Sequence, residues 1–266
     1  MYKVSLIGYG YWGSKLARNF QNSEYFKLST ITDNNKNNLF IAKRKFPLAK
    51  TYKDYKKSIK DTLTDLVIIS SSTNTHFKIA KYALQNFKHV LIEKPMSLSS
   101  KEVNILNKLS LKNKKEIFVD YPFLFSGTIT YIKKIIENNK YGKVVDIESF
   151  REQAPVRNDS NVIWDLGIHD ISILAYLLKN KPIKIRTIKK KNLRNNICDT
   201  AYINLKYSNG INVVIKNSWI SPTKIRVIKI KFDKAILHCD ENESLYKIKI
   251  YKKRTKNNWK NYKLEI

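Results

Sequence analysis

The chain has 266 residues (31.2 kDa), 42% of them hydrophobic, which is enough to bury a substantial core and excludes a disordered chain. It carries 51 Lys and Arg residues against 22 Asp and Glu, and the resulting net charge of +29 attracts nucleic acid, acidic membrane surfaces or anionic substrates. Because most of the basic residues are lysines, whereas arginine is preferred for phosphate forks and base edges, the composition favours solvated lysine faces and an anionic small substrate over nucleic-acid binding.

The first half of the chain alternates predicted strands with predicted helices. Strands are expected at 3–8, 27–33, 65–70, 89–92 and 116–120, and helices at about 12–21, 36–46, 76–86 and 99–113. Alternation of this kind predicts βαβ units, whose strands form a parallel, doubly wound sheet with helices on both faces. The predicted fold class of this half is therefore α/β.

The pattern changes near residue 121. Helices are predicted at about 128–139 and 165–178, and strands at 143–151 and around 183–190, 200–207, 211–219, 224–232, 234–239 and 245–252. Asn209-Gly210 between two of these strands is a strong hairpin signal. The sequence thus predicts a doubly wound domain over 1–121 and an α+β domain with an antiparallel sheet over 122–266.

No targeting signal, membrane span or metal site is apparent in the sequence. The N-terminus has no basic leader, long apolar region or cleavage site, and no stretch reaches the ~18 apolar residues of a membrane span. The two cysteines, Cys198 and Cys239, have no second Cys or His at metal-ligand spacing. We therefore expect a cytoplasmic protein with reduced, structural cysteines, no metal and no membrane partner.

A glycine-rich turn follows the first predicted strand. In this G-x-G-x-x-G motif, Gly8 can make the tight turn, Gly10 lets the backbone approach a pyrophosphate, and Gly13 permits close helix packing. Asp33 ends the second strand, where a carboxylate accepts hydrogen bonds from an adenosine ribose and repels a 2′-phosphate. The motif favours NAD, although basic residues close by leave NADP open, and the alternative is a structural turn with a capping Asp33.

Lys94 stands in Glu93-Lys94-Pro95, directly after the apolar run 90–92. A lysine at the carboxyl end of a buried parallel strand lies where open α/β sheets bind their ligands. Partly desolvated beside a nicotinamide, its amine can act as acid, base or hydrogen-bond donor to a substrate hydroxyl. The alternative is a solvated lysine, as most are in so basic a chain.

A second candidate group begins the helix predicted at 165–178. Asp165 and His169 are four residues apart and share one face of a helix, and a histidine oriented by a carboxylate is a suitable proton acceptor for alcohol oxidation. The same residues also fit a helix-capping Asp165 and a core His169. Just before them, Arg151 and Arg157 either grip a carboxylate or phosphate or belong to a mobile loop.

Four segments together closely resemble the Gfo/Idh/MocA family of NAD(P)-dependent oxidoreductases: 8–13, 72–76, 89–95 and 164–170. The resemblance spans residues 1 to about 180, and Glu93-Lys94-Pro95 is its most specific part. It implies a Rossmann domain followed by a domain with an open, mostly antiparallel sheet, with the site between them. The region after 180 shows no motif of its own, and a homo-oligomer formed through the C-terminal sheet stays an open question.

The resemblance also implies roles for single residues. Lys94, Asp165 and His169 are implied as catalytic, and Asp33 as the ribose-binding acid. The implied cofactor-binding residues are Gly8, Gly10, Tyr11, Trp12, Gly13, Asp33, Ser71, Thr73, Asn74, His76, Glu93, Lys94 and Pro95. The substrate-binding candidates are Tyr121, Arg151 and Arg157.

We therefore expect hydride transfer between a bound nicotinamide and a carbinol carbon of a sugar. His169 would take the hydroxyl proton, Asp165 would orient His169, and Lys94 would position and polarise the oxygen. The form of segment 164–170 resembles that of members acting on nucleotide sugars for surface polysaccharide synthesis. A free-sugar or inositol dehydrogenase is the near alternative, and a non-catalytic NAD-binding sensor or scaffold is the alternative from another class.

Overall fold

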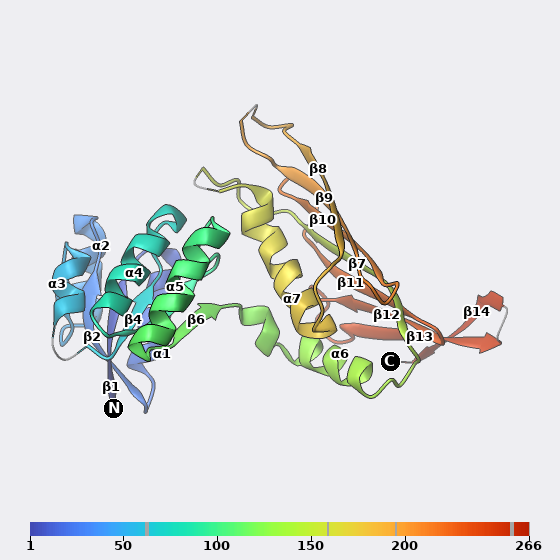
Figure 1. Cartoon of the computed structure of the whole chain (residues 1–266), viewed down its shortest axis with the longest axis horizontal. Helices are drawn as coiled ribbons and strands as arrows, with labels where there is room; N and C mark the ends of the chain where they lie inside the picture. The colour runs from blue at the N-terminus through green and yellow to red at the C-terminus, as the bar shows by residue number, and fades with distance from the viewer. Residues whose placement is uncertain (62–63, 159, 195, 256–257, 266) are drawn as a thin grey trace. The chain divides into compact units, whose positions relative to one another are not determined.

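The structure, a computed structural model, describes residues 1–266 except 62–63, 159, 195, 256–257 and 266, and describes no side chains over 253–266. The chain divides into two compact units, unit 1 (Met1–Asp120) and unit 2 (Tyr121–Ile266). Each unit is built on its own sheet, as Figure 1 shows. Among the described residues, no helix combines the length and apolar character that a bilayer crossing requires.

Unit 1 contains a six-stranded parallel sheet in the order β3-β2-β1-β4-β5-β6. Its strands are β1 (Tyr2–Ile7), β2 (Phe26–Thr32), β3 (Lys50–Tyr52), β4 (Leu66–Ile69), β5 (His89–Glu93) and β6 (Ile117–Asp120). Its helices are α1 (Tyr11–Gln21), α2 (Lys36–Lys45), α3 (Tyr55–Lys60), α4 (His76–Gln85) and α5 (Ser100–Asn113). The order reverses between β1 and β4, and this switch point is where doubly wound sheets bind ligands.

Alternate residues of the central strands face two separate cores. In β4, Val67 and Ile69 pack with α3, α4 and α5, whereas Ile68 packs with α1 and α2. Burial on both faces explains why β4 reads as a continuous apolar run rather than an alternating one. The predicted parallel sheet is confirmed, but the short elements β3 and α3 were not predicted.

Unit 2 contains an eight-stranded sheet in the order β14-β13-β12-β11-β7-β10-β9-β8. Its strands are β7 (Val144–Glu152), β8 (Lys184–Lys190), β9 (Thr200–Lys206), β10 (Asn212–Ser218), β11 (Ile225–Phe232), β12 (Ala235–Asp240), β13 (Ile248–Thr255) and β14 (Asn258–Glu265). Only β7 and β10 pair in parallel among the pairings of the described residues, so the mostly antiparallel sheet is confirmed. Strand β14 was not predicted.

Helices α6 (Gly127–Glu137) and α7 (Ile168–Leu178) cover the sheet of unit 2 (Figure 1). Their apolar residues, such as Ile132 and Leu174, form one core with the inward-facing residues of β7, β9, β10, β11 and β12. The Asn209-Gly210 turn joins β9 to β10 as an antiparallel hairpin, which was predicted. Gly210 has a φ of +88°, a backbone conformation that glycine adopts without steric cost.

Candidate functional site

The turn between β1 and α1 has the shape that a dinucleotide requires. Gly8 has a φ of +91°, and a Cβ there would lie 2.5 Å from the carbonyl oxygen of Ser70. A Cβ on Gly13 would lie 1.9 Å from the carbonyl oxygen of Gly8, so the helix packs directly on the turn. A Cβ on Gly10 would meet nothing within 4 Å, which leaves bare backbone facing open space at the start of α1. The residues present therefore fit a pyrophosphate at this helix N-terminus.

Asp33 is held beside this turn by three donors. Its Oδ2 accepts hydrogen bonds from the backbone N–H of Tyr9 at 2.7 Å and from Asn38 Nδ2 at 3.2 Å, and its Oδ1 accepts one from the backbone N–H of Asn35 at 2.8 Å. The residue is only 9% exposed, and these three hydrogen bonds fix the orientation of its carboxylate. A carboxylate has about four acceptor positions, and one remains for a ribose hydroxyl.

Tyr11 and Trp12, two predicted cofactor residues, are exposed at the start of α1. Their rings lie edge to face at 5.4 Å, and the Lys15 ammonium lies 4.1 Å from the centre of the Tyr11 ring. Lys15 also donates a hydrogen bond of 2.8 Å to the Tyr11 hydroxyl, which lowers the pKa of that tyrosine. Sequence reasoning missed Lys15, although its spacing of four residues from Tyr11 on a helix is the signal that would have shown the pair.

The loop after β4 contains the predicted residues Ser71, Thr73, Asn74 and His76. Thr73 is buried and Asn74 is exposed, and Ser71 Oγ lies 2.7 Å from Thr75 Oγ1 across the loop. The imidazole of His76 is buried, and both of its nitrogens face backbone carbonyl oxygens. We therefore do not propose that His76 contacts the cofactor directly.

Lys94 is half-buried and follows the last residue of β5, Glu93, at the carboxyl edge of the sheet. Glu93 pairs in register with Asp120, the last residue of β6, and the two side chains are hydrogen-bonded. Burial, followed by the charge of Asp120, raises the pKa of Glu93 to about 7. Burial also raises the pKa of Asp120. A carboxyl pair that holds a proton near neutrality therefore stands next to Lys94, and sequence reasoning did not single out Asp120.

The raised pKa of Glu93 predicts a pH-dependent stability. Since its pKa is higher folded than unfolded, its contribution is complete below the unfolded value of 4.5 and is lost as the pH rises through about 7. We expect the free energy of unfolding to fall between about pH 5 and pH 8, and Glu93→Gln to flatten that fall. Chemical denaturation across this range measures the effect, with the neighbouring Glu116→Gln as control. Identical pH profiles for wild type and Glu93→Gln would contradict the assignment.

In unit 2, Asp165 lies in a π-helical turn, Ile163–Gly167, and His169 in the first turn of α7. Asp165 Oδ2 accepts a hydrogen bond of 3.0 Å from Trp219 Nε1, and Arg157 Nη1 lies 3.7 Å from Asp165 Oδ1. The His169 ring packs edge to face on Phe123 at 4.9 Å. The regular helix expected from residue 165 is thus wrong for its first turn, and Trp219 is a partner that the sequence did not reveal.

A buried polar network anchors α7 to the sheet just after His169. Asp170 Oδ1 accepts hydrogen bonds from Ser149 Oγ at 2.9 Å and Arg151 Nε at 3.1 Å, and Oδ2 accepts one from Asn217 Nδ2 at 2.6 Å. Arg151 is 2% exposed and also lies 3.5 Å from Glu241. Because the buried guanidinium already interacts with these two carboxylates, we do not propose Arg151 as a substrate-binding residue.

The other two substrate-binding candidates are more accessible. Arg157 has a side chain that is 39% exposed, beside Asp165, and stays a candidate. Tyr121 is half-buried, and burial raises the pKa of its hydroxyl.

Lys94 belongs to unit 1, whereas Asp165 and His169 belong to unit 2, so the meeting of these three residues in one site stays a prediction. The described residues contain no group of three or more His, Cys, Asp or Glu placed to hold a metal ion.

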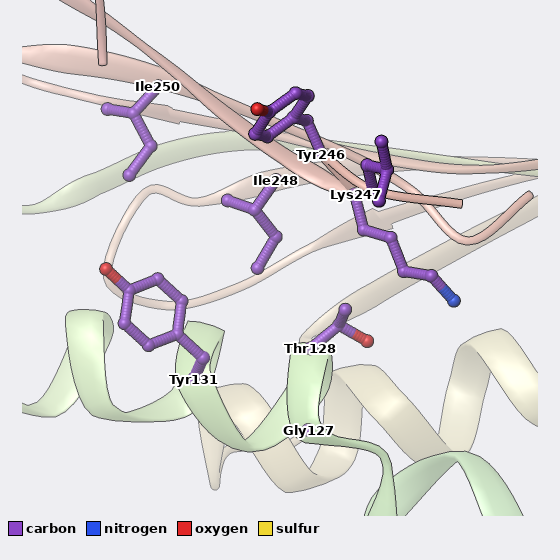
Figure 2. A pocket seen from close by; sticks show the side chains of 8 residues that line it. Gly127, Thr128, Tyr131, Tyr246, Lys247, Ile248 and Ile250 are labelled. Atoms are coloured by element: carbon purple, nitrogen blue, oxygen red, sulfur yellow. The ribbon is translucent and has the colours of Figure 1, made fainter. Parts of the chain in front are cut away.

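A cavity of about 420 Å³ opens in unit 2 between the first turns of α6 and the start of β13 (Figure 2). Its lining residues are Gly127, Thr128, Tyr131, Leu245, Tyr246, Lys247, Ile248 and Ile250. None of the predicted site residues lines it; the cavity is open to solvent, and its lining is mostly apolar. The chemistry-bearing side chains lie elsewhere, so we assign this cavity no role.

Comparison with known proteins yields family matches across both units. Residues 2–121 match the family described as "Oxidoreductase family, NAD-binding Rossmann fold", and residues 129–238 match the "GFO/IDH/MocA C-terminal domain". The chain is 28% identical over 228 residues to a myo-inositol 2-dehydrogenase of Thermotoga maritima. The matched region covers 81% of this chain and 68% of that protein. The chain spans about two thirds of the length of the curated relatives it matches.

Two solved structures share the fold over nearly the whole chain. An NAD-binding protein from Listeria innocua superposes with a TM-score of 0.88 at 20% identity, over 99% of this chain and 80% of that one. A UDP-N-acetylglucosamine 3-dehydrogenase from Acidithiobacillus ferrooxidans superposes with a TM-score of 0.83 at 21% identity, over 95% and 81%. At this level of identity the two likenesses establish the fold alone.

Proposed function

Because the chain belongs to the Gfo/Idh/MocA family of NAD-binding oxidoreductases, we propose that it is an NAD-dependent dehydrogenase acting on a CH–OH group of a sugar or cyclitol. The observation that carries the proposal is the carboxyl edge of the unit 1 sheet. There the open backbone at Gly10, the oriented Asp33 carboxylate and the half-buried Lys94 follow β1, β2 and β5. This is the edge at which doubly wound sheets bind dinucleotides and substrates.

The cofactor supplies the hydride chemistry when bound, and the chain supplies binding and proton handling. The Gly10 backbone and the first turn of α1 would hold the pyrophosphate, and Asp33 would accept a hydrogen bond from a ribose hydroxyl. Lys94 donates a hydrogen bond to the substrate oxygen and polarises it. His169 takes the hydroxyl proton, and Asp165, fixed by Trp219 and Arg157, orients His169.

Two substrate classes are supported by different observations. The net charge of +29 and the exposed Arg157 favour an anionic nucleotide sugar, as in surface polysaccharide synthesis. The identity to a myo-inositol 2-dehydrogenase favours a cyclic polyol as the second candidate. Since 28% identity leaves room for a different substrate pocket, we place the nucleotide sugar first and the cyclitol second.

A substrate panel tests both candidates. The purified chain is assayed for NADH formation with UDP-sugars, free sugars and myo-inositol, each with NAD and with NADP. We expect turnover with NAD in preference to NADP, because Asp33 repels a 2′-phosphate, and a higher kcat/KM for UDP-sugars than for uncharged polyols. Turnover of polyols alone would replace the first candidate with the second. Stoichiometric NAD binding without turnover on any substrate would instead indicate a non-catalytic sensor.

A further inference from the structure

His76 joins two loops that follow neighbouring strands of the unit 1 sheet. It is the first residue of α4 and is 1% exposed. Its Nδ1 lies 2.8 Å from the carbonyl oxygen of Pro95, and its Nε2 lies 3.0 Å from the carbonyl oxygen of Ser71. Ser71 follows β4, and Pro95 follows Lys94 at the end of β5, the strand that pairs with β4. One ring therefore links the two loops at the edge where Lys94 lies.

The chemistry of these contacts makes the imidazole the donor. Carbonyl oxygens only accept hydrogen bonds and a neutral imidazole carries one N–H, so we assign the hydrogen to Nδ1, which makes the shorter contact, 2.8 Å to Pro95 against 3.0 Å from Nε2 to Ser71. Pro95 has no N–H of its own with which to anchor the turn through backbone hydrogen bonds. A side-chain donor to its carbonyl oxygen therefore restrains the backbone immediately after Lys94.

The loop on the other side of His76 is itself internally bonded. Ser71 Oγ lies 2.7 Å from Thr75 Oγ1, and Thr75 Oγ1 donates a hydrogen bond of 2.7 Å to the carbonyl oxygen of Ser72. The backbone N–H of Thr75 donates to the same carbonyl oxygen at 2.9 Å. These bonds make loop 71–75 a defined support from which the His76 ring reaches the turn after β5.

We propose that His76 is a positioning residue, which holds the Lys94-Pro95 turn against loop 71–75 and thereby aims the Lys94 amine. This inference rests on the proposed function, since it takes Lys94 to act on the substrate oxygen. It differs from a direct cofactor contact, because both ring nitrogens face backbone carbonyl oxygens. Loss of the ring should therefore impair turnover more than cofactor binding.

The test compares His76→Leu, which removes the donors at similar volume, with His76→Gln, which keeps a donor. Loss of one hydrogen bond worth about 1.4 kcal/mol corresponds to about tenfold, so we expect kcat of His76→Leu to fall at least about tenfold. The Kd for NAD should change by less than about twofold, and His76→Gln should recover part of kcat. His89→Leu is the matched control, because His89 lies at the opposite end of β5, where its Nδ1 accepts a hydrogen bond of 3.1 Å from the Glu116 backbone N–H.

Several outcomes would overturn the inference. An unchanged kcat in His76→Leu would do so, and so would a loss of NAD binding that matches the loss of kcat, since that indicates a direct cofactor contact. If His76→Leu fails to fold, ¹⁵N NMR of the wild-type ring decides: a hydrogen on Nδ1 supports the bond to Pro95, and its absence refutes it. Failure of the proposed function looks different, because then the wild type turns over no substrate and Lys94→Ala equals the wild type.

Discussion

Replacing Lys94 with alanine is expected to lower kcat by ~10²-fold or more while NAD affinity stays nearly unchanged. The reason is the position of Lys94, half-buried after β5 at the carboxyl edge of the sheet, where doubly wound sheets bind their ligands. The features that we propose to hold the cofactor, Gly10 and Asp33, belong to other loops and are untouched by the substitution. Steady-state kinetics on a verified substrate and a titration with NAD measure the two quantities separately.

Two further variants make this test specific for the amine. Lys94→Met keeps most of the side-chain volume without the charge or the donor, so it should be as impaired as Lys94→Ala. Lys101→Ala removes an exposed lysine from α5 and should behave as the wild type, which controls for the loss of one positive charge. Wild-type turnover from either Lys94 variant would show that Lys94 is one more solvated lysine.

Replacing Asp170 with alanine is expected to lower the free energy of unfolding by about 3–5 kcal/mol, the usual cost of removing one partner of a buried ion pair. Asp170 is 1% exposed and accepts hydrogen bonds from Ser149, Arg151 and Asn217. Without it, the buried Arg151 guanidinium loses the carboxylate at 3.1 Å and is left beside Glu241 at 3.5 Å, a carboxyl whose pKa is raised by burial. Chemical denaturation followed by circular dichroism measures the loss.

A surface ion pair in the same unit supplies the control. Lys179 Nζ lies 2.8 Å from Glu137 Oε1, closer than the Arg151–Asp170 pair at 3.1 Å, but the two side chains are 70% and 45% exposed. Solvent screening makes such a pair worth little, so Lys179→Ala should leave the unfolding curve nearly unchanged. Equal effects of the two substitutions would show that burial does not determine the strength of the Asp170 network.

The elements that the sequence did not predict are short or lack a clear pattern. Strand β3 has 3 residues and α3 has 6, which is too few for a hydrophobic period to stand out. The first turn of the Asp165 segment was predicted as regular α-helix, but it is π-helical and packs on β10. A Cβ on Gly167 would lie 2.7 Å from Asn217 Oδ1, so this turn depends on a tertiary contact that no local spacing reveals.

The residues of the candidate site also divide into those with a local sequence signal and those whose contacts are tertiary. Gly8, Gly10, Gly13 and Asp33 were singled out from spacing alone, because the signal of each lies in the backbone turn or strand end to which it belongs. The contact of Arg151 with buried carboxylates could not be predicted, since an arginine on a strand gives the same sequence pattern whether it binds a substrate or a buried carboxylate. His76 was correctly predicted to begin a helix, yet its contact with Pro95 crosses from the loop after one strand to the loop after the next.

Local periodicity and turn residues were sufficient to predict the two kinds of sheet, because the side chains of a strand or helix repeat along the chain wherever one face is buried. Partners of buried polar groups followed only from the tertiary structure. Trp219 and Asp165 are 54 residues apart, and Asn217 and Asp170 are 47 apart. Each of these groups must find a hydrogen-bond partner once it leaves water, but which partner it meets depends on how distant strands come together in the sheet.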